Sequence, residues 1–114
     1  MSEEMNIDGL YDKLTLELRR GAIVLAALSQ LAEPQYGYSL IQRLAERGMA
    51  IDQGTLYPLL RRLEDQGLLN SEWKLEGSRP RRYYVISEAG TQVLERLAAE
   101  WRGLNDVMNK LIGD

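Results

Sequence analysis

DQGTLYPLLRRLEDQGLLNSEWKLEGSRPRRYYVI, residues 52–86, is the stretch that decides the fold. In its first half, leucines recur at steps of three and four residues, which is the spacing of one face of an α-helix. The leucines of this face are Leu56, Leu60 and Leu63. Asp52 is a plausible N-cap and Gly67 a plausible end, so we expect a helix over about residues 52–66. Pro58 lies inside that span and predicts that the helix begins one or two residues later or is slightly distorted.

The second half of the stretch predicts a β-hairpin. Residues 68–75 and 81–86 are rich in Trp, Tyr, Val and Ile, and the turn-forming residues 76–80 separate them. The tip carries three arginines beside a proline, namely Arg79, Arg81 and Arg82. Arginine binds phosphate in a forked geometry and enters narrow minor grooves of DNA, so three arginines at one tip indicate an anionic partner.

Three helical segments precede this stretch. Residues 7–20 carry apolar residues on one side and charges on the other, which predicts an amphipathic helix. Residues 21–31 are almost entirely apolar and predict a helix that is buried on most of its circumference. Pro34 ends it, and residues 36–47 form a short second core helix that Gly48 closes.

The last segment predicts a long helix, from Ser87 as N-cap to about residue 112, with one apolar seam. The seam follows alternating steps of three and four residues, as in a coiled coil: Leu94, Leu97, Trp101, Leu104, Met108 and Leu111. A seam of this length needs a partner helix, and a self-complementary dimer is the common solution. The alternative is packing across the N-terminal helix of the same chain. We therefore divide the chain into residues 1–86, which hold the N-terminal helix and the hairpin domain, and a dimerisation helix at 87–114.

Composition excludes several classes of function. The chain has 114 residues, enough for one domain and one appended element, and it contains no Cys and no His. The usual metal ligands and the commonest general base are therefore missing, so we expect neither an enzyme nor a metal or cofactor site. The N-terminus is acidic and no run of about 18 apolar residues occurs, so we expect a cytoplasmic protein that does not enter the membrane.

The charge is unevenly distributed. A formal net charge of −3 argues, taken alone, against a nucleic-acid partner. Residues 36–84, however, hold eight Lys/Arg against six Asp/Glu, a net of +2, while the remaining residues carry a net of −5. This separation is expected if the middle of the chain faces phosphate and the two ends form other surfaces.

The predicted order is helix, helix, helix, hairpin and helix. It indicates a mostly α-helical α+β fold, a winged helix-turn-helix with an N-terminal helix and a C-terminal dimerisation helix. In such a unit the third helix lies in the DNA major groove, about 12 Å wide, and the wing reaches flanking phosphates or the minor groove. Polar side chains off the leucine face suit base edges and phosphate: Gln53, Thr55, Tyr57, Arg61 and Arg62. The alternative is a solvated helix face in which the two arginines pair with Glu64 and Asp65.

These residues resemble the signature of the PadR family of transcriptional regulators. The resemblance rests on an ordered set of motifs: YGY at 36–38, GTLYPLLRRLEDQGLL at 54–69, Trp73, GSRPRRYY at 77–84 and SEAG at 87–90. It covers about residues 15–112 and implies a homodimeric repressor on a roughly palindromic operator of double-stranded DNA. It also implies that residues 51–66 are the recognition helix and that the C-terminal helix is the dimer arm. A single C-terminal helix is similar to the short-armed subgroup, which includes multidrug-sensing members.

Pattern and resemblance together give a set of expected DNA-binding residues. They are Tyr38, Gln53, Gly54, Thr55, Tyr57, Pro58, Arg61, Arg62, Arg79, Arg81 and Arg82. A second hypothesis, favoured by the overall acidity and the strong seam, is a winged-helix module for protein assembly that does not bind DNA.

The resemblance also implies a ligand site between two subunits. In multidrug-sensing relatives a tryptophan on the dimer helix stacks planar aromatic molecules, and Trp101 occupies the matching place. Leu18 and Ala22 are the implied additional walls. Asn105 stands one turn after the tryptophan, where a carboxylate would attract a cation, so a preference for cationic ligands is in doubt. The alternative is that Trp101 only fills the apolar seam.

Overall fold

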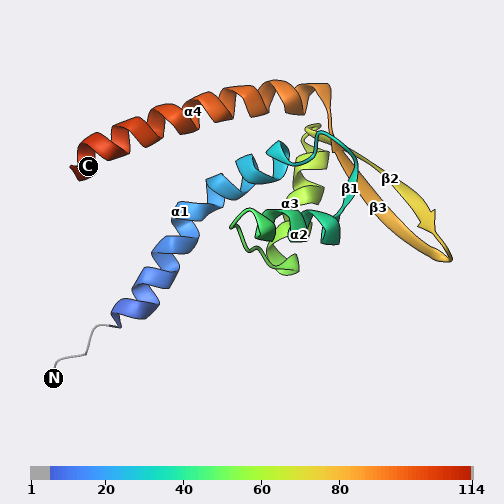
Figure 1. Cartoon of the computed structure of the whole chain (residues 1–114), viewed down its shortest axis with the longest axis horizontal. Coiled ribbons are helices and arrows are strands. Elements are labelled where there is room, and N and C mark those ends of the chain that lie inside the picture. The colour runs from blue at the N-terminus through green and yellow to red at the C-terminus, as the bar shows by residue number, and fades with distance from the viewer. Residues whose placement is uncertain (1–5, 114) are drawn as a thin grey trace.

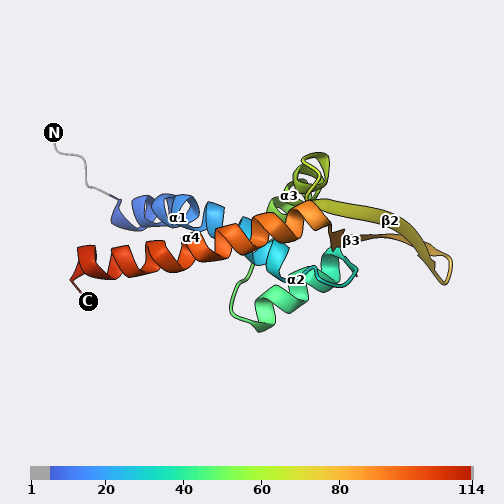
Figure 2. The same cartoon turned by 90° about the horizontal axis from the view of Figure 1, so that it is seen from above.

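The computed structural model describes residues 6–113, and it has the α+β winged-helix fold expected from the sequence (Figure 1). The elements are α1 (Ile7–Ser29), β1 (Gln35–Tyr36), α2 (Gly37–Glu46), α3 (Gln53–Asp65), β2 (Leu69–Glu76), β3 (Arg79–Ile86) and α4 (Glu88–Ile112). The hairpin of β2 and β3 projects at one end of the molecule, whereas α1 begins and α4 ends at the other (Figures 1 and 2). No helix within residues 6–113 combines the length and the apolarity needed to cross a bilayer.

The first helix is longer and more exposed than expected. The two segments predicted at 7–20 and 21–31 form one continuous helix, α1, because a single glycine at Gly21 weakens a helix by only about 1 kcal/mol relative to alanine. Within α1 only Ala27 and Leu28 are buried in the single chain. The prediction of a helix buried on most of its circumference is therefore wrong for the chain by itself.

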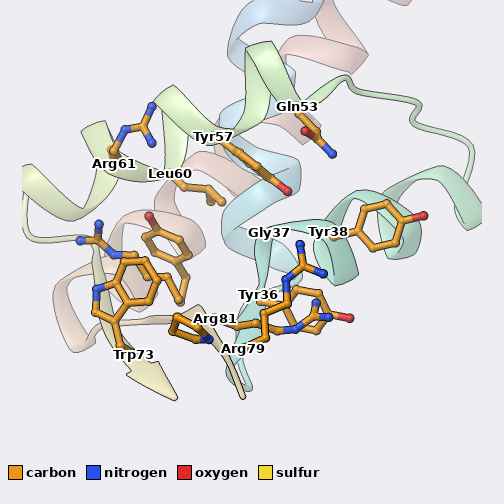
Figure 3. A pocket seen from close by; sticks show the side chains of 13 residues that line it. Tyr36, Gly37, Tyr38, Gln53, Tyr57, Leu60, Arg61, Trp73, Arg79 and Arg81 are labelled. Carbon is orange, nitrogen blue, oxygen red and sulfur yellow. The ribbon is translucent and has the colours of Figure 1, made fainter. Parts of the chain in front are cut away.

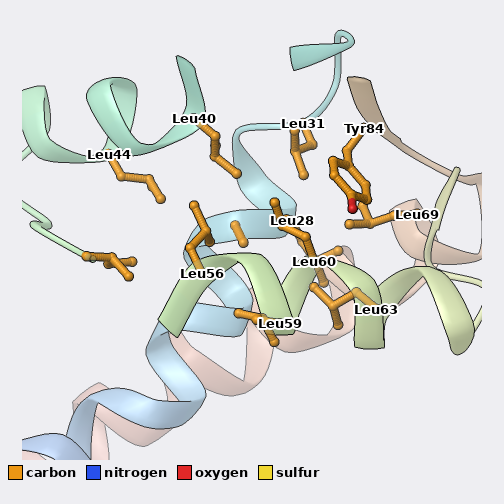
Figure 4. Packing of buried hydrophobic residues seen from close by; sticks show 12 residues of the cluster. Leu28, Leu31, Leu40, Leu44, Leu56, Leu59, Leu60, Leu63, Leu69 and Tyr84 are labelled. Carbon is orange, nitrogen blue, oxygen red and sulfur yellow. The ribbon is translucent and has the colours of Figure 1, made fainter. Parts of the chain in front are cut away.

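The core is a cluster of leucines at the junction of α1, α2 and α3 (Figure 4). Leu28 and Leu31 meet Leu40 from α2 and the leucine face of α3, and Leu69 and Tyr84 close the cluster from the sheet. Each fully buried leucine side chain contributes roughly 1.5–3 kcal/mol relative to exposure. Residues 53–65 are thereby fixed with one face inward: Leu56, Leu59, Leu60 and Leu63.

The ends of α3 follow from local chemistry. Asp52 is the N-cap residue and α3 begins directly after it at Gln53, so the helix does not start later because of Pro58. The proline ring lies in the second turn, where the carbonyl four residues earlier belongs to Gly54. At the other end Gly67 has φ +82°, a conformation that glycine adopts freely, and the chain turns directly into β2.

The sheet has the antiparallel order β1-β3-β2, with β1 a two-residue strand that the sequence did not indicate. The hairpin turn is tighter than the predicted tip at 76–80, since Leu75 pairs with Pro80 and Glu76 with Arg79. Two residues, Gly77 and Ser78, remain in the turn, and Gly77 has φ +64°, which suits the first central position of a type II′ turn.

The long helix α4 is anchored at its start. Ser87 is its N-cap as predicted, because its hydroxyl accepts a hydrogen bond from the Gly90 amide at 3.0 Å and donates one to the Gly67 carbonyl at 2.7 Å. A Cβ on Gly90 would collide with the carbonyl oxygen of Leu68, so a glycine is needed for this close approach. The start of α4 is thus fixed against the turn that leaves α3.

The two seam residues nearest the start of α4 pack within their own chain. Leu94 and Leu97 are half-buried and pack against the core of their own chain, and their assignment to a dimer interface stays a prediction. Farther along, α1 and α4 diverge toward their outer ends (Figure 1). The radius of gyration is 17.3 Å, whereas a compact chain of this length has about 13 Å. The single chain is therefore extended, with two arms that leave the core.

Candidate nucleic-acid interface

The outward face of α3 is polar and exposed. Most of the residues predicted to face DNA from this helix are exposed: Gln53, Gly54, Thr55, Pro58, Arg61 and Arg62. The Thr55 hydroxyl donates a hydrogen bond of 2.7 Å to the Asp52 carboxylate, and this bond lowers the pKa of that carboxyl group. The hydroxyl oxygen of Thr55 keeps its acceptor lone pairs for a partner.

A groove of about 660 Å³ separates α3 from the hairpin (Figure 3). We call it the wing groove, and its lining residues are Tyr36, Gly37, Tyr38, Gln53, Tyr57, Leu60, Arg61, Trp73, Arg79, Pro80, Arg81, Arg82 and Tyr84. Seven of the eleven predicted DNA-binding residues line it, whereas Gly54, Thr55, Pro58 and Arg62 belong to the outer face of α3. The fold therefore gathers the predicted residues on two adjoining surfaces.

The floor of the wing groove depends on a glycine. Tyr57 of α3 points toward the start of α2 (Figure 3), and a Cβ on Gly37 would collide with its ring. The tyrosine ring can lie against the α2 backbone only because residue 37 has no side chain. The YGY motif thus sets the distance between the two helices of the helix-turn-helix at this point.

The three wing arginines do not form a single basic tip. Successive residues of a strand point to opposite faces, so Arg79 and Arg81 share one face of the hairpin and Arg82 lies on the other. Only Arg79 stands beside the turn. The predicted cluster of three arginines at the tip is therefore wrong in its geometry.

Arg81 is held by its own chain. Its guanidinium carbon lies 4.3 Å from the centroid of the Tyr36 ring, and its Nε lies 3.4 Å from a carboxylate oxygen of Glu76. That carboxylate also accepts a hydrogen bond from the Tyr83 hydroxyl, which raises the pKa of the phenol above its ordinary value. The charge of Arg81 is accordingly partly neutralised before any ligand arrives.

Arg82 is held more firmly, on the face turned toward α3. Its Nη2 lies 2.6 Å from Glu64 of α3, and its Nε donates a hydrogen bond of 3.0 Å to the Ser71 hydroxyl. The guanidinium carbon lies 5.9 Å from the centroid of the Trp73 ring and 5.5 Å from that of Tyr84. The alternative suggested by the sequence, in which Arg61 or Arg62 pairs with the acids of α3, is not what the structure shows, since Glu64 pairs with the wing.

Three other cations of α3 and the wing are uncommitted. Within the described residues, neither Arg61 and Arg62 of α3 nor Arg79 of the wing makes an ion pair. Lys74 is paired with Glu72 at 3.6 Å on the exposed hairpin. The positive charge available to a phosphate chain is therefore concentrated on the outer turns of α3 and at the wing tip.

Sequence reasoning missed several residues of this surface. Tyr36 and Trp73 line the wing groove, and Glu64 and Ser71 hold Arg82, yet none of the four was predicted as a site residue. A signal was available for Trp73, because a two-residue turn at Gly77 and Ser78 places it directly opposite Arg82. No local signal links Glu64 to a wing residue 18 positions away.

The residues predicted for the dimer and the ligand lie on the two arms. Trp101 is 50% exposed in the single chain, and Leu18 is 81% exposed. Asn105 is exposed and Ala22 is half-buried. Neither the wing groove nor a second hollow at the start of α4 is lined by any of these four residues.

A leucine-cored helix-turn-helix with an exposed polar third helix and a wing defines the class of winged-helix DNA-binding regulators. Residues 24–96 match the transcriptional regulator PadR-like family. The chain is 36% identical over 98 residues to the transcriptional regulator Rv3488 of Mycobacterium tuberculosis, covering 85% of this chain and 89% of that protein. The chain belongs to the PadR-like family. Members of this family are DNA-binding transcriptional regulators; they are not enzymes.

Solved structures agree with this assignment. The crystal structure of a PadR family regulator from Eggerthella lenta superposes with a TM-score of 0.86 at 50% identity, covering 96% of this chain and 97% of that chain. A PadR-like transcription factor from Bacteroides fragilis gives a TM-score of 0.74 at 35% identity, with 87% and 98% covered. The similarity extends over nearly the whole chain and includes both arms.

Proposed function

We propose that the chain is a homodimeric, sequence-specific repressor that binds a roughly palindromic operator. One observation carries the proposal: the same chain presents an uncommitted basic and polar surface on α3 and the wing, and unpaired apolar faces on α1 and α4. The first surface suits DNA and the second suits another copy of the chain. We propose repression, as distinct from activation, on the family resemblance alone, since the geometry of the recognition helix and wing is the same for both.

The apolar arms support the dimer. On α4, four seam residues are between 42% and 73% exposed: Trp101, Leu104, Met108 and Leu111. On α1, five large aliphatic residues are between 46% and 81% exposed: Ile7, Leu10, Leu14, Leu16 and Leu18. Exposed apolar surface on this scale marks a site of association in a folded chain, and a two-fold dimer is the commonest closed solution.

The geometry of α3 supports DNA binding in the major groove. Its buried leucines leave the outer residues free to approach base edges, and Arg61 and Arg62 stand one helical turn or more beyond Gln53 and Thr55. Two recognition helices related by a two-fold axis would occupy half-sites about 34 Å apart, one turn of the duplex. Such an arrangement reads a palindrome.

Selection of bound sequences from random DNA tests the proposal. We expect an inverted repeat with half-sites one helical turn apart. The substitution Leu104→Glu places a charge in the seam and should give a monomer with greatly reduced operator binding. The matched control Asn109→Glu adds the same charge to α4 at a position off the apolar seam and should leave both properties unchanged. Selection that yields no common sequence would favour the alternative of a protein-assembly module.

We also infer a site for a planar aromatic molecule between the arms of the dimer. The support is that the Trp101 indole is half exposed in the single chain, so two such rings related by symmetry could border a slot. A dye that enters the slot should quench Trp101 emission in a saturable way. In the Trp101→Ala variant the remaining emission comes from Trp73 of the wing, and saturable binding should be lost. Undiminished affinity in that variant would contradict the site.

A further inference from the structure

Three side chains from three elements form one polar contact between the recognition helix and the wing. Glu64 of α3 accepts hydrogen bonds from the Ser71 hydroxyl of β2 at 2.5 Å and from Arg82 of β3 at 2.6 Å. Arg82 donates a further bond of 3.0 Å to the Ser71 oxygen, which closes the triangle. The side chains of Arg82 and Glu64 are 34% and 25% exposed, so the pair is shielded from water better than a surface ion pair.

This contact is the hydrogen-bonded attachment of the wing to the recognition helix α3. Ser71 is the last residue of β2 that is partly buried, and every residue from Glu72 to Pro80 is exposed. Inward of the triangle, Leu69 and Tyr84 are buried in the core and hold the base of the hairpin. On the other side of the hairpin, Arg81 stacks on the Tyr36 ring of β1, so the triangle is the hydrogen-bonded contact that ties the outer hairpin to α3 itself.

The length of the hairpin amplifies any tilt. From Trp73, which lies opposite Arg82, to the turn at Gly77 is about 13 Å of extended chain. A rotation of about 15° at the triangle would displace the turn by about 3 Å, which exceeds the tolerance of a hydrogen bond to phosphate. Control of the tilt is thus control of whether Arg79 reaches its partner.

We propose that Glu64, Ser71 and Arg82 are positioning residues that hold the wing at a fixed angle to the recognition helix. Arg82 then acts within the protein and does not bind phosphate, and the wing tip delivers Arg79 to the DNA. The inference rests on the proposed function and adds to it the part of the chain that couples the two DNA-contacting elements.

The direction in which one substitution changes the affinity for DNA separates this proposal from direct binding of Arg82 to DNA. If Arg82 contacted phosphate, removal of the nearby Glu64 carboxylate would take away a repulsive charge and strengthen binding. If the triangle positions the wing, the same substitution releases the wing and weakens binding although a negative charge has been removed. The two expectations are opposite.

The experiment compares Glu64→Ala with Asp65→Ala, the removal of the neighbouring acid on the same helix. Asp65 is exposed and makes no ion pair within the described residues. We expect Asp65→Ala to leave the affinity for the selected operator unchanged or to raise it, and Glu64→Ala to lower it about tenfold. Hydroxyl-radical footprints should keep the protection under α3 and lose the flanking protection under the wing. A gain in affinity with Glu64→Ala would overturn the proposal.

A measurement without DNA makes the outcome independent of the proposed function. Hydrogen exchange of the free protein should become faster at the hairpin amides beyond Ser71 in Glu64→Ala, with exchange in the leucine core unchanged. Ser71→Ala, which removes two of the three bonds and little volume, should show the same pattern if Glu64→Ala does not fold. The exchanged pair Glu64→Arg with Arg82→Glu should restore slow exchange in part.

Failure of the proposed function and failure of the positioning role give different results. If the unmodified chain selects no DNA sequence, the proposed function is refuted, and the exchange data alone decide whether the triangle fixes the wing. If the unmodified chain selects an operator but exchange in the hairpin is the same with and without Glu64, the positioning role is refuted and the function stands.

Discussion

Operator affinity should depend on salt with a slope that reports how many arginines are free to bind phosphate. Arg61, Arg62 and Arg79 are the cations of α3 and the wing that make no ion pair within the described residues, which gives six in a dimer. Each neutralised phosphate contributes about −0.9 to the slope of log K against log salt, so the slope should be about −5. Between about 50 and 200 mM salt, affinity should fall on the order of 10³-fold. If Arg81 and Arg82 also bound phosphate, the slope would be about −9 and the loss about 10⁵-fold.

Fluorescence anisotropy of a labelled operator at a series of salt concentrations measures this slope. Arg79→Ala should flatten it by about 2 in the dimer, because one contact is lost in each subunit. Arg82→Ala releases the wing and with it the Arg79 contact, so it should lower affinity and flatten the slope by no more than Arg79→Ala does, and adding it to Arg79→Ala should leave the slope unchanged. Arg102→Ala, an exposed cation on α4, is the matched control and should change neither quantity. A slope near −9, or a slope that Arg79→Ala does not alter, would refute the assignment of free and committed arginines.

Three further predictions concern the fold around the site. In urea denaturation, Gly37→Ala should destabilise the chain by about 1–3 kcal/mol because its Cβ meets the Tyr57 ring, and the same substitution should cost little in a chain that already carries Tyr57→Ala. Leu28→Ala should lower the free energy of unfolding by about 2–5 kcal/mol, whereas Leu75→Ala on the exposed wing should change it little. Burial raises the pKa of Tyr84, so the fold favours the neutral phenol; this stabilisation is complete below the ordinary value near 10 and is lost as the pH rises above it. Tyr84→Phe should therefore move alkaline unfolding, followed by circular dichroism, to higher pH, and an unchanged midpoint would contradict the burial argument.

Sequence reasoning succeeded where short-range chemistry sets the structure. Asp52, which occupies the N-cap position without a capping side-chain hydrogen bond, and Gly67 marked the ends of the recognition helix, and Ser87 marked the start of the last helix, because cap residues act within a few residues of their own position. The alternation of leucines gave the inner face of α3. These signals were sufficient for the winged-helix fold and for the outward residues of the recognition helix.

The sequence was insufficient where distant segments meet. The positions of Arg81 and Arg82 depend on the register of the hairpin, and a two-residue turn sets this register. The sequence, with a proline at position 80, instead indicated a longer tip at 76–80. The heptad pattern of α4 indicated a partner but did not distinguish the same chain from a second one, and Leu94 and Leu97 found their partner within the chain. The pairing of Glu64 with Arg82 was invisible for the same reason, since nothing local connects them.

The fixed start of α4 has a consequence for the targets that such a pair of chains can read. Because Ser87 and Gly90 attach this helix directly to the turn after α3, no flexible linker separates α4 from the recognition helix. Two copies joined as proposed would hold their recognition helices at one fixed separation, so that binding depends on the spacing of the half-sites as well as on their sequence. Five extra base pairs at the centre of a target, about half a turn of the duplex, would put one head on the wrong side of the double helix even with both half-sites intact.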